Sequence, residues 1–150
     1  MPARATPRGS AIIPTMRYRD APAAIDWLVR VLGFQARLIV PGENDGEIAH
    51  AQLTLEAGPH PDMIMLGSAR DDDCGALVQA PASPAAPLTQ AAYIVVPDIK
   101  AHYAHAKAAG AEIVMELADQ DYGGKLYSCR DPQGQLWNIG SYNPWTDGGQ

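Results

Sequence analysis

The sequence contains one structural unit twice, and this repeat limits the possible folds more than any other feature. Residues 11–33 and 89–110 each combine a short apolar strand, an Asp, a helical run and a Gly. Asp20 and Asp98 are expected to cap the two helix starts, because an Asp side chain accepts hydrogen bonds from the free N–H groups there. Gly33 and Gly110 are expected to end the helices in the left-handed conformation. Two such units pack around a pseudo-two-fold axis, so we expect the functional site where they face each other.

Each predicted helix is followed by three predicted strands. These strands cover residues 34–40, 50–55 and 62–67 in the first copy, and residues 112–115, 125–130 and 135–142 in the second. The last two strands enclose Asp131-Pro132-Gln133-Gly134, whose residue types fit a type I turn and predict a β-hairpin. The buried stripe of the first helix is predicted from its helical spacing to consist of Ile25, Leu28, Val29 and Leu32.

This pattern predicts an α+β protein made of two tandem βαβββ modules, at residues 11–69 and 89–143. The segment at residues 70–88 is rich in Pro and Ala and has no periodicity, so we interpret it as a linker. Its run Asp71-Asp72-Asp73 lacks the alternating ligands and the bidentate Glu of a calcium loop, so it is expected to be solvated. Residues 1–10 are expected to form a disordered tail, and residues 144–150 a second tail.

Composition excludes several classes of partner. The net charge of −6 argues against nucleic-acid binding, which depends on clustered Lys and Arg. No apolar run approaches the ~20 residues of a membrane span, and no apolar region follows Arg4 and Arg8 as in a secretory signal. Cys74 and Cys129 have no motif spacing, which favours a reducing compartment. We therefore expect a cytoplasmic protein that binds neither nucleic acid nor a membrane.

Several motifs occur in a characteristic order along the chain. They are Tyr18-Arg19-Asp20, Leu32-Gly33-Phe34, Ala108-Ala109-Gly110-Ala111 and residues 130–137. Their order and spacing resemble the vicinal oxygen chelate superfamily, which includes glyoxalase I, bleomycin-resistance proteins and extradiol dioxygenases. With Tyr122-Gly123-Gly124 before the last hairpin, the chain looks most similar to an uncharacterised glyoxalase-like subgroup. The resemblance covers about residues 12–142, and it implies a curved mixed sheet around a cleft between the modules and a homodimer.

In metal-dependent members of that superfamily, His, Glu, His and Glu from four strands hold one divalent ion. The resemblance places Ile13, Met65, Ala91 and Asn138 at these positions. Only Asn138 offers an oxygen, and that oxygen belongs to a neutral amide. Because glyoxalase and dioxygenase chemistry needs the metal to polarise substrate oxygens, we expect this chemistry to be missing. No metal and no other cofactor is predicted.

Side chains alternate along a strand, so one residue that faces the cleft fixes the others. With Ile13 facing the cleft, the predicted ligand-binding residues are Thr15, Arg17, His50, Gln52, Met63, Met65, Tyr93, Ser128 and Asn138. The methionines and the tyrosine ring suit an apolar or planar ligand, and the hydroxyl and amide groups suit hydrogen bonds that orient it. Arg17 is expected either to pair with a carboxylate or another anion of the ligand or to form a salt bridge with a Glu or Asp across the dimer.

Three functions are compatible with this lining. The leading hypothesis is a protein that binds a small organic molecule without a metal, as the resemblance to bleomycin-resistance proteins implies. A second is a metal-dependent lyase, isomerase or dioxygenase of the same superfamily, with ligands such as His50 and His60. A third is a metal-free enzyme that uses His50 as a general base. His102 and His105 have no third ligand nearby and are expected to be solvated, and the sequence leaves open whether the protein is an enzyme.

Overall fold

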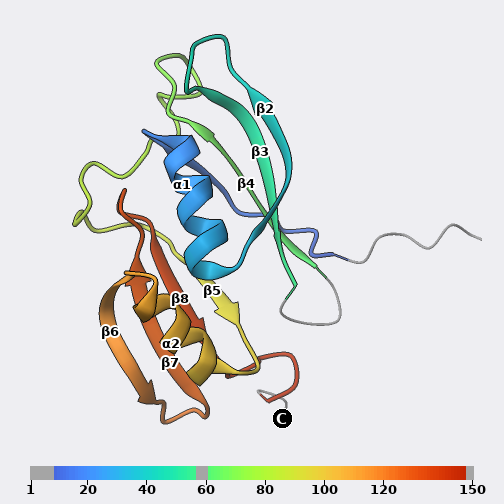
Figure 1. The fold of residues 1–150 in the computed structure, drawn as a ribbon, viewed down its shortest axis with the longest axis vertical. Helices are drawn as coiled ribbons and strands as arrows, with labels where there is room; N and C mark the ends of the chain where they lie inside the picture. The colour runs from blue at the N-terminus through green and yellow to red at the C-terminus, as the bar shows by residue number, and fades with distance from the viewer. Residues whose placement is uncertain (1–8, 57–60, 148–150) are drawn as a thin grey trace, which may run out of the picture.

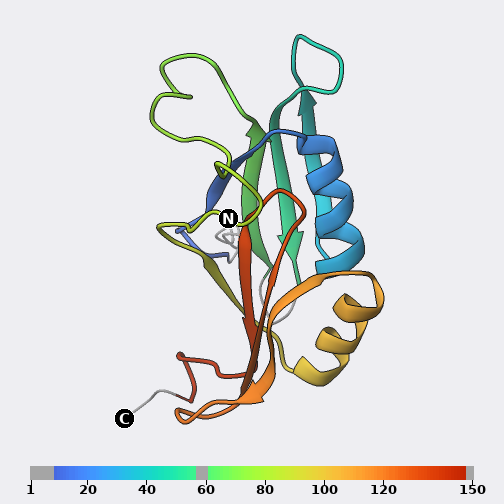
Figure 2. The same ribbon diagram turned by 90° about the vertical axis from the view of Figure 1, so that its left-hand side faces the viewer.

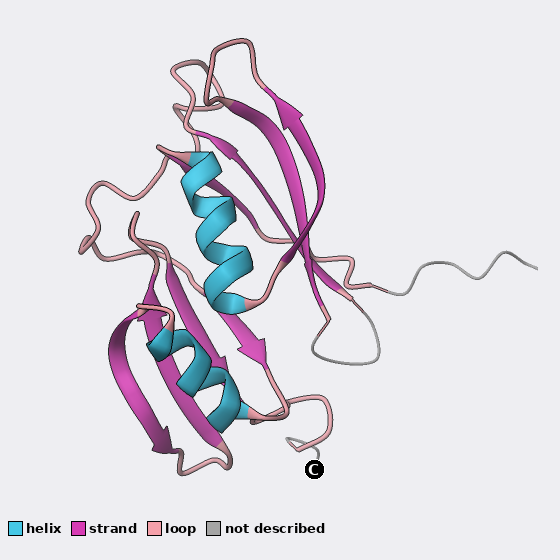
Figure 3. Cartoon of the chain, viewed as in Figure 1, coloured by secondary structure: helices cyan, strands magenta, loops and turns pink. Residues whose placement is uncertain are grey.

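Two four-stranded sheets, each covered on one face by a helix, make up the fold (Figures 1 and 3). The computed structural model describes residues 9–56 and 61–147. The first module contains β1 (Thr15–Tyr18), α1 (Ala21–Trp27), the π-helical turn η1 (Leu28–Leu32), β2 (Gln35–Pro41), β3 (Ile48–Leu55) and β4 (Asp62–Ser68). The second contains β5 (Ala92–Val95), α2 (Ile99–Ala108), β6 (Glu112–Asp119), β7 (Lys125–Arg130) and β8 (Leu136–Gly140). The expected tail at residues 1–8, residues 148–150 and His60 lie outside the described residues.

The two sheets have the same topology. Their strand orders are β1-β4-β3-β2 and β5-β8-β7-β6, with β1 parallel to β4 and β5 parallel to β8. The remaining neighbours are antiparallel, so both sheets are mixed. The structure therefore confirms an α+β fold of two tandem βαβββ modules.

The helix boundaries follow from the expected caps. The carboxylates of Asp20 and Asp98 accept hydrogen bonds from the backbone N–H of Ala23 and Ala101, each at 3.1 Å. Gly33 ends the first helical segment with φ +85°, and Gly110 follows α2 with φ +93°. Both values lie in the left-handed region that glycine adopts without a steric penalty.

The first helix departs from the predicted stripe in its second half. Val29 is 41% exposed, whereas Val31 is fully buried. The reason is η1, in which the N–H of Gly33 bonds to the carbonyl of Leu28 and widens the turn. A π-helical turn rotates the following residues away from regular α-helical spacing, so a stripe derived from that spacing fails here.

A buried carboxylate joins the two modules. Asp131, from the predicted hairpin turn, is 1% exposed, and its Oδ2 accepts hydrogen bonds from Tyr18 Oη at 2.6 Å and Trp137 Nε1 at 3.2 Å. Its Oδ1 accepts from the backbone N–H groups of Gln133 and Gln135, both at 3.0 Å. The motif residues of both modules thus meet at one ionisable group in the core.

The helices make a second connection between the modules. Nδ1 of His102 lies 2.7 Å from Oη of Tyr127, and its Nε2 lies 3.4 Å from the carbonyl oxygen of Leu32. His102 is half-buried, so the expectation that it is solvated is wrong. Burial lowers its pKa, because removal from water disfavours the charged ring. The sequence around His102 does not predict this position, because Tyr127 and Leu32 are distant from it along the chain.

The Pro-rich segment at residues 70–88, between β4 and β5, is anchored to both modules, and we call it the anchored segment. Arg19 donates to the carbonyl of Ala82 at 3.1 Å. Nη1 of Arg130 lies within hydrogen-bond distance of the carbonyls of Pro84 at 3.3 Å and Ala86 at 3.2 Å. These contacts fix the segment over the junction of the modules.

Among the described helices, none combines the length and the apolar character required to cross a membrane.

Candidate functional site

Both helices lie on one side of the sheets, and the opposite sheet faces turn to the other side (Figure 2). We call these uncovered faces the open faces. Across the first sheet one row of facing residues runs Thr15, Met65, Gln52, Leu38. Across the second sheet the corresponding row runs Tyr93, Asn138, Ser128, Met115. The internal repeat of the sequence is therefore also a repeat of residue positions on the two open faces.

The open face of the first sheet holds six of the predicted ligand-binding residues. They are Thr15, Arg17, His50, Gln52, Met63 and Met65, of which Thr15 is exposed and the others are half-buried. The amide Nε2 of Gln52 lies 3.0 Å from Nε2 of His50. An amide N–H that donates to this nitrogen occupies the lone pair that a general base would use. The geometry matches a hydrogen-bonded strand histidine better than a catalytic base.

The open face of the second sheet holds the other three predicted residues. Tyr93 is 38% exposed, and its hydroxyl donates to the carbonyl of Tyr142 at 2.7 Å. Ser128 is 1% exposed and donates its hydroxyl to Oδ1 of Asn138 at 2.6 Å. Because Ser128 is buried, its hydroxyl fixes the amide of the half-buried Asn138 in place and does not itself reach the surface.

The two groups of residues do not surround one common pocket within this chain. The open faces are turned to the same side rather than toward each other (Figure 2). A hollow of about 360 Å³ does lie at the junction of the modules, and we call it the inter-module hollow. Of the nine predicted ligand-binding residues, only Thr15 and Arg17 line it.

The other walls of the inter-module hollow come from segments that hold none of the predicted ligand-binding residues. They include Val78, Pro81, Pro87 and Leu88 of the anchored segment and Gln135, Leu136 and Trp137 of the hairpin. The Pro content was a usable signal, because each proline fixes φ and makes the segment a stiff wall rather than a loose tether. The contacts with Arg19 and Arg130 were not readable from sequence.

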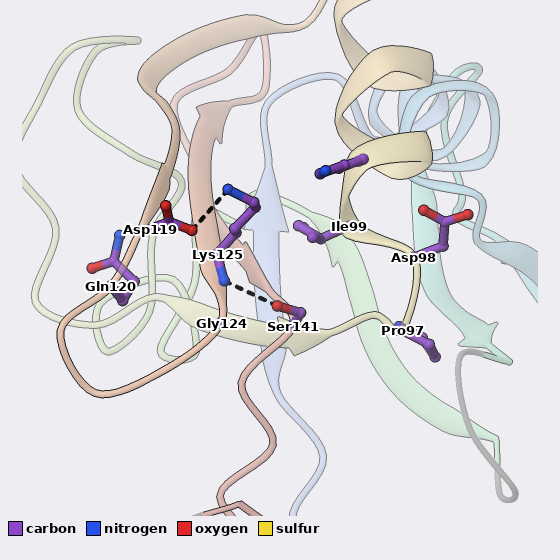
Figure 4. Close-up of a pocket in the computed structure, with 9 residues that line it drawn as sticks. Pro97, Asp98, Ile99, Asp119, Gln120, Gly124, Lys125 and Ser141 are labelled. Carbon is purple, nitrogen blue, oxygen red and sulfur yellow. Dashed lines mark hydrogen bonds and ion pairs between the residues drawn. The ribbon is translucent and has the colours of Figure 1, made fainter.

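A second hollow of about 520 Å³ lies at the start of α2 (Figure 4). Asp119 and Lys125 are neighbours on β6 and β7 at one wall of it and point toward each other, with Nζ and Oδ1 2.7 Å apart. The hydrogen bond and charge of Lys125 lower the pKa of the Asp119 carboxyl. Because this pair satisfies itself and is solvent-exposed, the hollow offers no uncompensated charge from these two groups to a ligand.

Comparison with known proteins decides the family. The model of the Glyoxalase/Bleomycin resistance protein/Dioxygenase superfamily matches residues 12–139. The chain belongs to this superfamily. It is 31% identical to an uncharacterised protein of Mycobacterium bovis over 131 residues, which are 87% of this chain and 82% of that protein.

Several solved structures have a similar fold. TioX from Micromonospora sp. ML1 is 29% identical, with a TM-score of 0.65 over 90% of this chain and 100% of that one. A glyoxalase/bleomycin resistance protein/dioxygenase from Nocardioides is 20% identical, with a TM-score of 0.60 over 100% of this chain and 91% of that one. A glyoxalase I variant from Zea mays is 15% identical and gives 0.63, with 85% of this chain and 43% of that chain covered. The last two likenesses concern the fold alone.

Ile13, Met65, Ala91 and Asn138, which the resemblance places at the superfamily's metal positions, have side chains that fit a divalent ion poorly. Met65 and Asn138 occupy equivalent places in their sheets, each facing a residue of the first strand of its module. The amide oxygen of Asn138 already accepts the hydroxyl of Ser128, while Ile13 and Ala91 have hydrocarbon side chains. Within residues 9–56 and 61–147, no three His, Cys, Asp or Glu side chains gather in a metal-binding geometry. A hard or borderline cation requires anionic oxygen or imidazole ligands, which these four residues do not supply.

Proposed function

We propose that this protein binds a small organic molecule on its open faces and in the inter-module hollow, without the divalent metal used by enzymes of its superfamily. The observation that carries the proposal is the pair of equivalent central positions held by Met65 and Asn138. A thioether and an engaged amide replace two carboxylates there. Thioethers adapt to irregular apolar shapes, and fixed amide and hydroxyl groups orient a ligand by hydrogen bonds.

We further propose that the working form is a homodimer. In a two-fold pair the open face of the first sheet can lie opposite the open face of the partner's second sheet. The edge strands expose apolar side chains, including Ile39 at 45% and Met115 at 58%. Uncovered apolar surface of this kind is typical of interaction sites. Free Cys74 and Cys129 support the cytoplasm as the proposed location, because thiols persist in reducing compartments.

A thermal-unfolding screen in the presence of EDTA tests the proposed binding. A library of aromatic acids, amides and antibiotics is screened, and a true ligand stabilises the native state by RT ln(1 + [L]/Kd), about 2.7 kcal/mol at a hundredfold excess over Kd. Met65→Glu places a charge at the centre of the open face and should abolish the shift. Leu77→Glu is the matched control, because Leu77 is 85% exposed and lies outside both the strands of the open faces and the lining of the inter-module hollow.

The proposal predicts that ligands stabilise the EDTA-treated protein as strongly as the protein supplied with divalent metal. Stabilisation that appears only after nickel, zinc or manganese is added would contradict it. An equal shift in Met65→Glu and in the original protein would remove the open face of the first sheet from the site.

A further inference from the structure

We propose that the inter-module hollow binds the carboxylate of an organic acid and that Arg17 is the group that recognises it. This inference rests on the proposed function, and it names the chemical class of the ligand. It is carried by an unpaired guanidinium, by the charge of the hollow, and by the mixture of apolar and uncharged polar groups in the remaining walls.

The guanidinium of Arg17 is placed by a glycine on the neighbouring strand. Arg17 faces Gly67 across β1 and β4, and a Cβ built on Gly67 would collide with Nη1 of Arg17. The absence of a side chain at residue 67 thus leaves the space that the guanidinium occupies. The rest of the strand pair carries side chains at the facing positions, so this space is specific to Arg17.

Most of the hydrogen-bonding capacity of Arg17 is unused. A guanidinium has five N–H donors, and the one partner found among the described residues is the carbonyl of Ser68, 3.5 Å from Nη1. That distance is at the outer limit of a hydrogen bond. None of the ion pairs among the described residues includes Arg17, although every Asp and Glu of the chain lies within those residues. No Asp or Glu of the same chain therefore occupies the guanidinium of Arg17, and a salt bridge with a second chain stays a prediction.

Arg19 and Arg130 differ from Arg17 in this respect. Each donates to backbone carbonyls of the anchored segment. Their role is to hold the wall of the hollow, which leaves Arg17 as the cation available to a ligand. A planar fork of donors matches a carboxylate in bidentate geometry, and such pairs are roughly twice as strong as neutral hydrogen bonds.

The hollow is positive in an otherwise acidic protein. Arg17 is the one charged residue among those that line it, and no Asp or Glu is present there. The chain as a whole has 17 acidic and 11 basic residues. A cationic ligand would meet unfavourable charge in this hollow, whereas an anion would meet the one local charge of opposite sign.

The remaining walls favour an organic acid over an inorganic anion. Val78, Leu88 and Leu136 supply apolar surface, and the hydroxyl and amide groups come from Thr15, Gln79, Thr89, Gln90 and Gln135. The volume of about 360 Å³ falls within the range of about 300–1,000 Å³ typical of small-molecule sites. An apolar body with one carboxylate satisfies both the walls and the guanidinium.

Calorimetric titration with two matched probes tests this inference. The probes are 1-naphthoate and its neutral isostere 1-naphthamide, with inorganic phosphate as a third arm. Arg17→Gln removes the charge and keeps a polar side chain. Arg37→Gln is the matched control, because Arg37 lies on the same sheet, pairs with Glu56 at 3.0 Å and does not line the hollow.

The original protein and Arg37→Gln should bind 1-naphthoate about tenfold or more tightly than 1-naphthamide. Arg17→Gln should lose this preference while it retains binding of the amide. Arg17→Lys should recover only part of it, because a point charge lacks the bidentate fork. Circular dichroism of each variant verifies that the fold is intact.

Each other outcome overturns the inference. Equal binding of acid and amide by the original protein, or unchanged preference in Arg17→Gln, refutes carboxylate recognition but leaves the proposed function standing. Binding of phosphate as tight as that of naphthoate refutes the organic-acid class. Failure of both naphthalene probes to bind contradicts the inference and removes its support from the proposed function, which the wider thermal screen then tests separately.

Discussion

Removal of a single hydroxyl tests whether the buried carboxylate of Asp131 holds the modules together. Tyr18→Phe keeps the buried ring and deletes the group that donates to Oδ2 of Asp131 at 2.6 Å. Tyr18 is 0% exposed, so water cannot replace the lost donor without a rearrangement. We expect destabilisation, because a buried acceptor loses one of its partners.

The magnitude follows from the remaining contacts of Asp131. Hydrogen bonds to charged groups contribute about 1.5–3 kcal/mol. Trp137 and two backbone N–H groups still donate to the carboxylate, so it is not left without partners. We therefore expect a loss of about 2 kcal/mol, which corresponds to roughly 4–8 °C in Tm for a chain of this size. Asp131→Asn should cost more, because an amide N–H2 then faces the N–H donor of Trp137.

Urea unfolding followed by far-ultraviolet circular dichroism measures both effects. Tyr122→Phe is the matched control, because Tyr122 is 51% exposed and no hydrogen bond of its hydroxyl is found among the described residues. A double-mutant cycle between positions 18 and 131 isolates the pairwise energy. If Tyr18→Phe is as stable as Tyr122→Phe, the carboxylate does not join the modules in the way described.

Three further predictions concern pH and the anchored segment. Burial raises the pKa of the Cys129 thiol from 9.0 to about 12. Above pH 9 the thiol is therefore deprotonated in the unfolded chain but not in the folded one, and the free energy of unfolding should fall by about 1.4 kcal/mol per pH unit. Cys129→Ala should flatten that slope in urea titrations, and an unchanged slope would contradict the assignment. Burial lowers the pKa of His102, so its neutral ring contributes fully to the free energy of unfolding above pH 6.5, and this contribution is lost as the pH falls below 6.5. His102→Gln should remove this acid dependence of the urea midpoint. Gly134→Ala should destabilise the protein more than Gly46→Ala. Both glycines have a positive φ, but only the Cβ at residue 134 would lie 2.8 Å from the carbonyl oxygen of Ser83. Equal urea midpoints of the two variants would contradict close packing of the Pro-rich segment against the hairpin turn.

Local sequence predicted the features that local physics determines. Asp20, Asp98, Gly33 and Gly110 bound the helices because capping and left-handed backbone depend on the residue itself and its near neighbours. Strand alternation placed core and open faces correctly for the same reason. The neighbours of Ser128 and Asn138 along β7 and β8 point to the opposite face and are buried: Tyr127, Cys129, Trp137 and Ile139.

The features that sequence missed depend on contacts between distant segments. The expected solvation of His102 failed because Tyr127 and Leu32, both far away in sequence, surround it. The inter-module hollow takes its walls from the Pro-rich segment, which lacks periodicity and is fixed by arginines of two other elements. Strand alternation predicts which residues share a face of a sheet, but not how the two sheets are arranged. The predicted ligand-binding residues therefore lie on two open faces in the structure and not around one cleft.

Metal content tests the central proposal most directly. The protein is purified without a chelator, incubated with nickel, zinc and manganese, dialysed, and measured by inductively coupled plasma mass spectrometry. A variant that restores the superfamily's ligands, Ile13→His, Met65→Glu, Ala91→His and Asn138→Glu, serves as the positive control. The account predicts no stoichiometric metal in the original protein and metal uptake in the restored variant. One divalent ion per chain or per dimer site in the original protein would contradict the account.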